Sequence, residues 1–437
     1  MPDHQKKPVR VALLGCGTVG GGVIRLILGS EDRLASRIGA PVEIAHVLVK
    51  NAKGPRVPEC DPAWVTTDPE KVFGDASVDV VVEVMGGLSP AQGYVERALR
   101  AKKSVVSANK MLLAHSGPSL IRLAAAEGVD LAFEASVGGG IPVIRMLREA
   151  LTSDRVTSVH AILNGTCNYI LTRMRAEGLA FGDILKDAQR LGYAEAEPSL
   201  DVDGHDAAQK LVVLSMLAFG AEVDSNAVSV EGIRAIDAID FRFAERFGFN
   251  IKHLCIGKDR GERLELRAHP TMVPNSSVIG NTNDVLNCVF IQGRALGPCL
   301  LVGRGAGEMP TAVSVVADIV DVARSRIEGQ AGLSTRGIRI GKRELVPMSE
   351  IETRYYLRFD VADQPGVLAF IAGALGEEGV SIEQMVQEGR GGAGTAATSV
   401  LMITHFSKEG AVTRALAKVA NAPFMKAPPR LIRIEDV

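Results

Sequence analysis

Short apolar runs alternate with helix-like stretches along the first third of the chain. The apolar runs predict strands at residues 9–14, 42–49, 78–85, 104–107 and 129–133. Residues 94–101 and 118–127 have helical character and lie between some of these runs. Strands separated by helices require crossover connections, which produce parallel pairing. The pattern therefore predicts an α/β fold with a mostly parallel sheet over residues 1–135.

The pattern changes after Gly138-Gly139-Gly140. A helical segment near 142–151, a strand at 156–163, helices through residue 219 and several strands within 251–303 predict an α+β second domain over 136–303. A helix follows at 311–326, and we expect segment 304–333 to return to the first domain. Residues 334–349 mix Gly, Pro and charge, which predicts a linker.

Residues 350–437 predict a third module. Its expected elements are a strand (355–361), a helix (367–378), a strand (382–387), a Gly-rich turn (389–394), a strand (397–404), a helix (408–420) and a strand (430–434). This βαββαβ order is that of the ferredoxin-like fold.

Composition narrows the class of protein. The chain has 437 residues, beyond the roughly 250–300 at which one core stops growing, so several domains are expected. A net charge of −2 argues against a nucleic-acid partner, and no apolar run predicts a membrane span or a signal peptide. The six cysteines lack disulfide or zinc-type spacing, which indicates a reducing compartment, and we expect a cytoplasmic protein.

The first strand leads into the motif Gly15-Cys16-Gly17-Thr18-Val19-Gly20, with a helix-like run directly after it. A G-x-G-x-x-G between a strand and a helix is typical of Rossmann-type dinucleotide binding, because its glycines permit a tight turn and close approach of the pyrophosphate. We therefore expect Gly15, Gly17, Thr18, Val19 and Gly20 to bind a dinucleotide. A bare glycine turn is the alternative.

The residues after the second strand bear on the choice of cofactor. NAD enzymes usually place an acid there to bind the ribose 2′-hydroxyl. This chain has Lys50, Lys53 and Arg56 instead, with no acid between residues 49 and 56. The pattern favours NADP(H), with Lys50 as a phosphate ligand, over NAD(H); a solvated basic loop is the other interpretation.

The segment 191–214 concentrates acids around one lysine. A helix beginning near Asp203 would place Asp206 and Lys210 at i and i+4 on one face. The apolar residues around them predict that this helix is largely buried. Buried Asp–Lys pairs are costly and are often functional, although a surface salt bridge is the simpler alternative.

The order of the motifs along the chain resembles that of homoserine dehydrogenases. The resemblance rests on the N-terminal GxGxVG, SANK at 107–110, EASVGGGIP at 134–142, NGTCNYIL at 164–171, LGYAEAEPSLDVDGHDAAQKL at 191–211 and GRGAGEMPTA at 303–312. Residues 350–437 resemble an ACT domain, a small-ligand sensor. Since the match starts at residue 9, the monofunctional form is expected.

The resemblance implies reduction of L-aspartate 4-semialdehyde to L-homoserine, and its reverse, in threonine, methionine and isoleucine biosynthesis. It implies catalysis by Lys210 as proton donor, with Lys110 and Asp206 beside it. Substrate contacts are implied for Gly192, Glu195, Asp201 and Asp206. Further cofactor contacts are implied for Ser107, Lys110, Gly305 and Gly307.

A monovalent cation such as Na⁺ is also implied, held by Glu134 and the carbonyls of Val137, Gly139 and Ile141. One carboxylate with carbonyl oxygens suits a hard cation and is poor for zinc. The alternative is a glycine-rich hinge with a capping glutamate.

The remaining implications concern partners and rival functions. We expect a homodimer or homotetramer whose ACT module binds an amino-acid effector, with L-threonine the first candidate. Cys167 would suggest a thiol nucleophile, but no adjacent histidine supports it. A different semialdehyde or amino-acid dehydrogenase and a catalytically silent NADP sensor are the rival functions; the presence of Lys210 and Lys110 argues against the second.

Overall fold

The computed structural model describes residues 7–388 and 397–437. The chain forms two compact units. The first unit comprises Met1–Gly165, His205–Ala227 and Val285–Arg343, and the second comprises Thr166–Gly204, Val228–Asp284 and Glu344–Val437. Each unit thus combines segments that are distant in the sequence.

The first unit contains a parallel six-stranded sheet in the order β3-β2-β1-β4-β5-β6. Its strands are β1 (Val9–Leu14), β2 (Val42–Leu48), β3 (Val65–Thr66), β4 (Val80–Glu83), β5 (Ser104–Ser107) and β6 (Leu131–Ala132). The predicted parallel sheet is confirmed. The short β3 was not expected, and β4 and β6 are shorter than the apolar runs that predicted them.

The helices that accompany this sheet are α1 (Thr18–Leu28), α2 (Glu31–Ile38), α3 (Glu70–Phe73), α4 (Ala91–Arg100) and α5 (Lys110–Glu127). Helix α5 begins eight residues before the predicted start, so that boundary was wrong. Pro118 lies inside the helix instead of at its first turn. The side chain of Asn109 caps the true start by accepting from the Leu112 amide at 3.1 Å.

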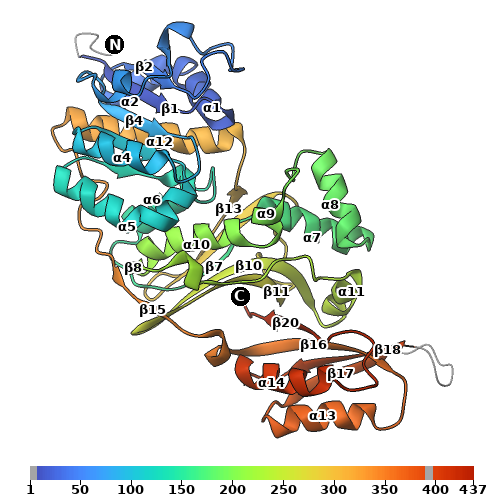
Figure 1. Ribbon diagram of the computed structural model, residues 1–437. Helices are drawn as coiled ribbons and strands as arrows, with labels where there is room; N and C mark the ends of the chain where they lie inside the picture. Colours follow the sequence, from blue (N-terminus) through green and yellow to red (C-terminus); the bar gives the residue numbers. More distant parts are fainter. Residues whose placement is uncertain (1–6, 389–396) are drawn as a thin grey trace. The chain divides into compact units, whose positions relative to one another are not determined.

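Helix α12 (Glu308–Ile327) packs beside α1, far from it in sequence (Figure 1). A Cβ on Gly22 of α1 would lie 3.0 Å from the Cβ of Ala312, so the two helices meet at a glycine. Ala312, Val315 and Ile319 belong to the same apolar core as Val11. The segment after the second predicted domain thus completes the core of the parallel sheet.

The first unit also contains an antiparallel run in the order β13-β12-β7. These strands are β7 (Val156–Ile162), β12 (Leu286–Gly293) and β13 (Gly297–Arg304). Helix α6 (Val143–Arg145) continues into a π-helical turn, η3 (Met146–Ala150), and α10 (His205–Ala218) packs against α5. A small parallel pair joins β8 (Ala221–Glu222) to β14 (Gly341–Lys342).

The second unit is built on a long antiparallel hairpin. Strands β10 (Phe249–Arg260) and β11 (Arg263–Pro274) pair along their whole length. Short strands β9 (Ser229–Val230) and β15 (Glu344–Leu345) pair with β11 in parallel. The helices of this unit outside its C-terminal part are α7 (Gly165–Glu177), α8 (Phe181–Arg190), α9 (Ser199–Val202) and α11 (Ala238–Arg246).

The C-terminal part of the second unit has the predicted βαββαβ order. Its elements are β16 (Glu352–Ala362), α13 (Val367–Glu377), β17 (Ile382–Glu388), β18 (Ala397–Thr404), α14 (Glu409–Ala420) and β20 (Arg430–Ile434), with a two-residue β19 (Ser407–Lys408) before α14. The sheet order is β20-β16-β18-β17. The predicted Gly-rich turn at 389–394 lies outside the described residues.

Segment 334–349, predicted as a linker, carries strands. Its β14 pairs with β8 in the first unit, whereas its β15 pairs with β11 in the second. Over residues 7–388 and 397–437, no helix is both long enough and apolar enough to cross a membrane.

Candidate functional site

A cleft of about 470 Å³ opens where β1 meets α1. Gly15, Cys16 and Gly17 line one side of it, and the end of β2 with the following loop lines another. Gly15 has φ +103°, and a Cβ on Gly20 would lie 2.5 Å from the carbonyl oxygen of Gly15. The helix therefore packs tightly on the turn. A Cβ on Gly17 would meet nothing within 4 Å, which leaves room for a ligand at the helix start.

The electrostatics of this cleft suit an anionic diphosphate. No side chain caps α1 at Gly17, and Thr18 of the first turn is exposed while Val19 is half-buried, so the backbone N–H groups of this turn remain available to a phosphate. These residues fit the dinucleotide predicted from the motif.

The loop after β2 supplies positive charge to the same cleft. Lys50, Asn51 and Arg56 line it, and the described lining residues include no carboxylate. Arg56 donates to the carbonyl oxygen of Ala52 at 2.9 Å, so its guanidinium helps to build the loop. Lys50 is exposed and has no ion-pair partner within the described part of the chain.

The other predicted cofactor residues have structural neighbours. The Ser107 hydroxyl donates to the buried carboxylate of Glu83 at 2.7 Å and accepts from the Asn109 amide. Gly305 packs against Gly139 and the side chain of Asn287. Gly307, at φ +127°, precedes α12. Contacts of these residues with a cofactor stay predictions.

A second site centres on Asp206 of α10, a carboxylate that is 5 % exposed. Its Oδ2 accepts from the Lys210 ammonium at 2.7 Å, one helical turn later. Its Oδ1 lies 2.9 Å from Nζ of Lys110, the first residue of α5. The structure thus brings together the three residues predicted to be catalytic, and it places Asp206 and Lys210 on the buried helix that the sequence predicted.

The charges in this cluster determine its protonation. Burial by itself would raise the pKa of the Asp206 carboxyl, but the charges of Lys210 and Lys110 and their hydrogen bonds hold that pKa well below its usual range. Asp206 therefore remains ionised at neutral pH. Two ammonium groups against one carboxylate leave a net charge of about +1 beside the open side of Lys110, which is 40 % exposed.

Asn164 is a residue of this cluster that the sequence analysis did not single out. Its Nδ2 donates to Oδ2 of Asp206 at 2.9 Å, and it is 4 % exposed. The preceding carbonyl, that of Leu163, accepts from Lys210 at 2.8 Å. Asn164 opens the NGTCNYIL motif, and a polar side chain directly after an apolar strand was the signal that could have found it.

The predicted substrate residues Gly192, Glu195 and Asp201 lie in the second unit. Glu195 is exposed, and Gly192 has φ +78°. Asp201 accepts a long hydrogen bond of 3.4 Å from the Thr166 hydroxyl. Their roles stay predictions.

Glu134 of the predicted cation site is buried, and burial raises the pKa of its carboxyl. Its two oxygens accept from the Ile144 and Arg145 amides at 2.9 and 2.7 Å, so it caps α6. The Gly139 carbonyl accepts from the Ser314 hydroxyl, and the Ile141 carbonyl accepts from the Val143 amide. The backbone of Val137 is in an extended conformation. Each oxygen retains a second lone pair for a cation.

Among the described residues, no three His, Cys, Asp or Glu side chains gather in a metal-binding arrangement. Cys167 is buried and its thiol donates to the carbonyl oxygen of Asp201 at 3.1 Å. The thiol thus has a structural contact, and the expectation that Cys167 is no nucleophile stays a prediction.

Family models match the three parts of the chain. The model for homoserine dehydrogenase matches residues 142–320, that for the homoserine dehydrogenase NAD-binding domain matches 15–134, and that for the ACT domain matches 355–421. A homoserine dehydrogenase from Neisseria gonorrhoeae is 39% identical over 437 residues, covering 99% of both chains. The chain belongs to the homoserine dehydrogenase family.

Other members of the family agree in length and fold. The Bacillus subtilis homoserine dehydrogenase is 39% identical and covers 98% of this chain and 99% of its own. The crystal structure of a homoserine dehydrogenase from Thiobacillus denitrificans matches with a TM-score of 0.90 and 39% identity, covering 98% and 99% of the two chains. The cleft therefore lies in an NAD-binding domain, and the C-terminal βαββαβ part is an ACT domain.

Replacing Asn164 tests how strongly the Asp206 cluster depends on it. Asn164→Ala removes a buried hydrogen bond to a charged group, which typically contributes about 1.5–3 kcal/mol, so the free energy of unfolding should fall by about that amount. Urea unfolding measures it. Asn226→Ala changes an exposed asparagine of the same unit and should stay within about 0.5 kcal/mol of the parent. Equal stability of both variants would show that Asp206 does not need Asn164.

Proposed function

We propose that this homoserine dehydrogenase reduces L-aspartate 4-semialdehyde to L-homoserine, and catalyses the reverse reaction, with Lys210 as the proton donor. The observation that carries the proposal is the donor geometry of the Lys210 ammonium. Two of its three N–H groups are directed to Asp206 and to the carbonyl oxygen of Leu163. The third has no partner in the described part of the chain, which leaves it for the substrate oxygen.

The surroundings of Lys210 support this role. A bound nicotinamide nucleotide supplies the hydride that reduces the aldehyde carbon. The aldehyde oxygen then gains negative charge, which the net positive cluster stabilises. Lys210 donates a proton to that oxygen and is held in place by Asp206, while Lys110, across the same carboxylate, positions the substrate. Glu195 and Asp201 are proposed to bind the substrate's amino or hydroxyl end, with Gly192 giving backbone room.

Substitution of Lys210 tests the reaction and the donor together. Lys210→Ala should lower kcat for NADPH oxidation with aspartate semialdehyde by about 10²–10⁴-fold, the usual scale of general acid catalysis, with little change in cofactor affinity. Lys210→Arg preserves the charge that Asp206 needs but releases its proton poorly, so it should also be slow. Near-normal turnover of Lys210→Ala would exclude the proposed role.

For the cofactor, we propose NADP(H) in preference to NAD(H). Support comes from the absence of a described carboxylate in the lining of the cleft and from the exposed ammonium of Lys50. A 2′-phosphate carries the charge that this lysine would pair with, whereas a 2′-hydroxyl does not.

A pair of lysine variants tests this preference. Lys50→Ala should weaken NADP(H) more than NAD(H), measured as KM and as Kd by fluorescence titration. Lys53→Ala is the matched control, because Lys53 is an exposed lysine of the same loop that does not line the cleft. Equal losses for both cofactors in Lys50→Ala would mean that the loop is only solvated.

A monovalent cation such as Na⁺ is proposed at Glu134, Val137, Gly139 and Ile141. The supporting feature is one buried carboxylate next to main-chain carbonyls, a set of hard oxygen ligands. Such an ion would stabilise the turn that leads from β6 (Leu131–Ala132) to α6, where Glu134 already acts as a cap.

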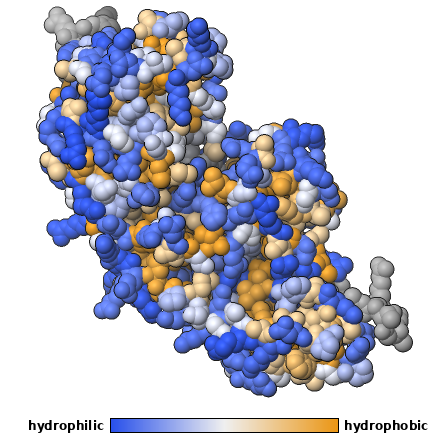
Figure 2. Space-filling model, viewed as in Figure 1, coloured by the Kyte–Doolittle hydropathy of each residue, from blue (hydrophilic) through white to orange (hydrophobic). Residues whose placement is uncertain are grey.

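We further propose a homodimer or homotetramer in which ACT domains pair. Hydrophobic residues interrupt the hydrophilic surface at the lower end of Figure 2, over the ACT part. Phe370, Met385 and Phe406 of this part are 49 %, 43 % and 62 % exposed. Strand β17 ends the described strand order, so its outer edge is available for pairing.

The ACT domain is proposed to bind an end product of threonine, methionine and isoleucine biosynthesis, with L-threonine as the first candidate. Helix α13 begins after Gly366, which has φ +90° and no side-chain cap. The backbone N–H groups of its first turn are therefore available to the carboxylate of an amino acid.

Two glycine variants test this binding site. Gly366 and Gly379 lie near opposite ends of α13, both have positive φ, and a Cβ on either would enter open space. Gly366→Ala should raise the threonine concentration for half inhibition by 10-fold or more, because its methyl group covers the helix start, whereas Gly379→Ala should not. Isoleucine and methionine serve as comparisons. Inhibition that is unaffected by Gly366→Ala would place the effector elsewhere.

A further inference from the structure

The C-terminal strand β20 lies between the ACT sheet and the β10–β11 hairpin and pairs with a strand of each. Its residues Arg430–Ile434 pair with β16 of the ACT sheet. Arg433 and Ile434 also pair with Thr271 and Met272 of β11, and the Glu435 amide donates to the Met272 carbonyl at 3.0 Å. The ACT sheet is thus joined by backbone hydrogen bonds to the long hairpin of the second unit.

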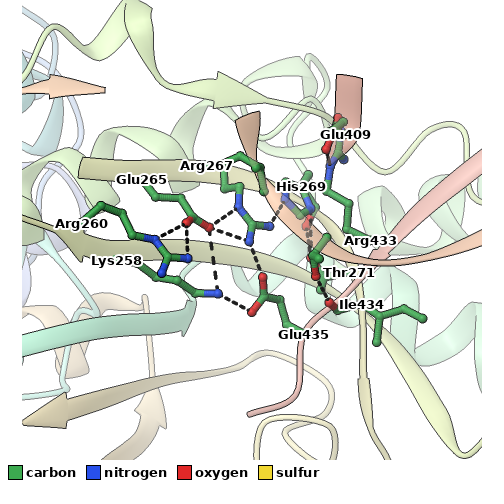
Figure 3. A network of polar contacts seen from close by, with 12 residues as sticks. Lys258, Arg260, Glu265, Arg267, His269, Thr271, Glu409, Arg433, Ile434 and Glu435 are labelled. Carbon is green, nitrogen blue, oxygen red and sulfur yellow. Dashed lines mark hydrogen bonds and ion pairs between the residues drawn. The ribbon is translucent and has the colours of Figure 1, made fainter. Parts of the chain in front are cut away.

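Buried charges reinforce this joint (Figure 3). Arg267 of β11 is 1 % exposed and its guanidinium binds the carboxylates of Glu265 and Glu435. It also donates to Nε2 of His269 at 2.7 Å. Because a guanidinium can only donate, His269 must be neutral with its proton on Nδ1. The Arg267 guanidinium is therefore paired with carboxylates from both β11 and the segment after β20, which fixes the two segments to each other.

Arg433 extends the network toward a different segment. Its guanidinium is 4 % exposed and lies between two carboxylates. One is Glu409, the first residue of α14, which accepts from Nε at 2.6 Å. The other is Glu231, directly after β9, which accepts from both terminal nitrogens at 3.0 and 2.6 Å. A single side chain thus ties an ACT helix to the segment 229–234.

The residues after Glu231 contact the segment 199–204, in which Asp201 belongs to α9. The Ile233 amide donates to the carbonyl oxygen of Val202 at 2.8 Å. A Cβ on Gly232 would lie 2.4 Å from that same oxygen, so only glycine permits the approach. Arg234 then binds the Asp203 carboxylate through Nε at 2.6 Å. The segment is fixed against 199–204 at three consecutive residues.

We infer that Arg433, Glu231 and the segment 232–234 form a relay that carries the effector signal from the ACT domain to the segment 199–204, which is α9 with the two residues after it. This inference rests on the proposed function, which assigns an effector to the ACT domain and a substrate contact to Asp201. A shift of β20 or α14 moves Glu231, and the tight contact at Gly232 and Ile233 passes that displacement to Val202 and Asp203. Effector binding therefore changes the affinity for substrate, by about 5- to 150-fold if the coupling is of the usual size.

Two glutamate variants of the full-length enzyme test the relay. Glu231→Gln removes the charge from one partner of Arg433 while Glu409 remains. Glu350→Gln is the matched control, since Glu350 also pairs with an arginine of the second unit, Arg263, at 2.8 Å. The two glutamate side chains are similarly exposed, at 48 % and 47 %. Glu350 has no described contact with the segment 199–204.

The first readout is independent of any effector. Amide hydrogen exchange of residues 199–204 should be at least about 5-fold faster in Glu231→Gln than in the parent and in Glu350→Gln, because the anchor of segment 232–234 is weakened. Unchanged exchange in Glu231→Gln overturns the relay, whether or not threonine binds.

The second readout is inhibition by L-threonine, with binding measured separately by calorimetry. Glu231→Gln should bind threonine and retain basal turnover within about 2-fold, yet the rise in KM for aspartate semialdehyde should be largely lost, whereas Glu350→Gln responds like the parent. A parental response in Glu231→Gln overturns the relay as a signal route. If exchange changes as expected but the parent neither binds nor responds to threonine, the mechanical link is supported and the proposed effector fails.

Discussion

The buried carboxylate of Asp206 is the constraint on which the arrangement of the first unit depends. A buried charge is unfavourable unless it is paired and hydrogen-bonded, and Asp206 has three donors, on Lys210, Lys110 and Asn164. These donors come from α10, from the start of α5 and from the residues directly after β7. The electrostatic requirement of one side chain therefore brings three segments of the first unit together. Lys210 uses two of its N–H groups for Asp206 and the Leu163 carbonyl, and the third points to no partner in the described part of the chain.

The second unit likewise depends on buried charges that must be paired, here in a larger network. Arg267 and Arg433 are almost completely buried, and each lies between carboxylates from different segments of the chain. Such pairs add little net stability compared with apolar packing, but separating them leaves a buried charge unpaired, so the segments that carry them stay together. The ACT domain is consequently integrated with the β10–β11 hairpin through β20. A domain attached in this way can transmit strain, which a module on a flexible linker cannot do.

Local patterns in the sequence predicted much of this structure. Strand and helix periods depend on neighbouring residues, so the parallel sheet, the βαββαβ order of the ACT part and the pairing of Asp206 with Lys210 one helical turn apart could all be predicted. The glycine spacing likewise identified the cleft beside α1. The start of α5 was misplaced because a proline is usually found at the first turn of a helix, whereas Pro118 lies within it.

By itself, then, the sequence determined most of the longer strands and helices, the nucleotide-binding turn and the family. Tertiary structure alone decided that Asn164 meets Asp206 across 42 residues, that β20 has β11 as its second neighbour, and that 341–345, predicted as linker, contributes to two sheets. The hydrophobic period of a segment indicates that the strand has an apolar face. The period contains no information about which distant strand or charge will lie beside that strand. That choice is made when buried donors and acceptors find partners, and those partners are set by the whole fold.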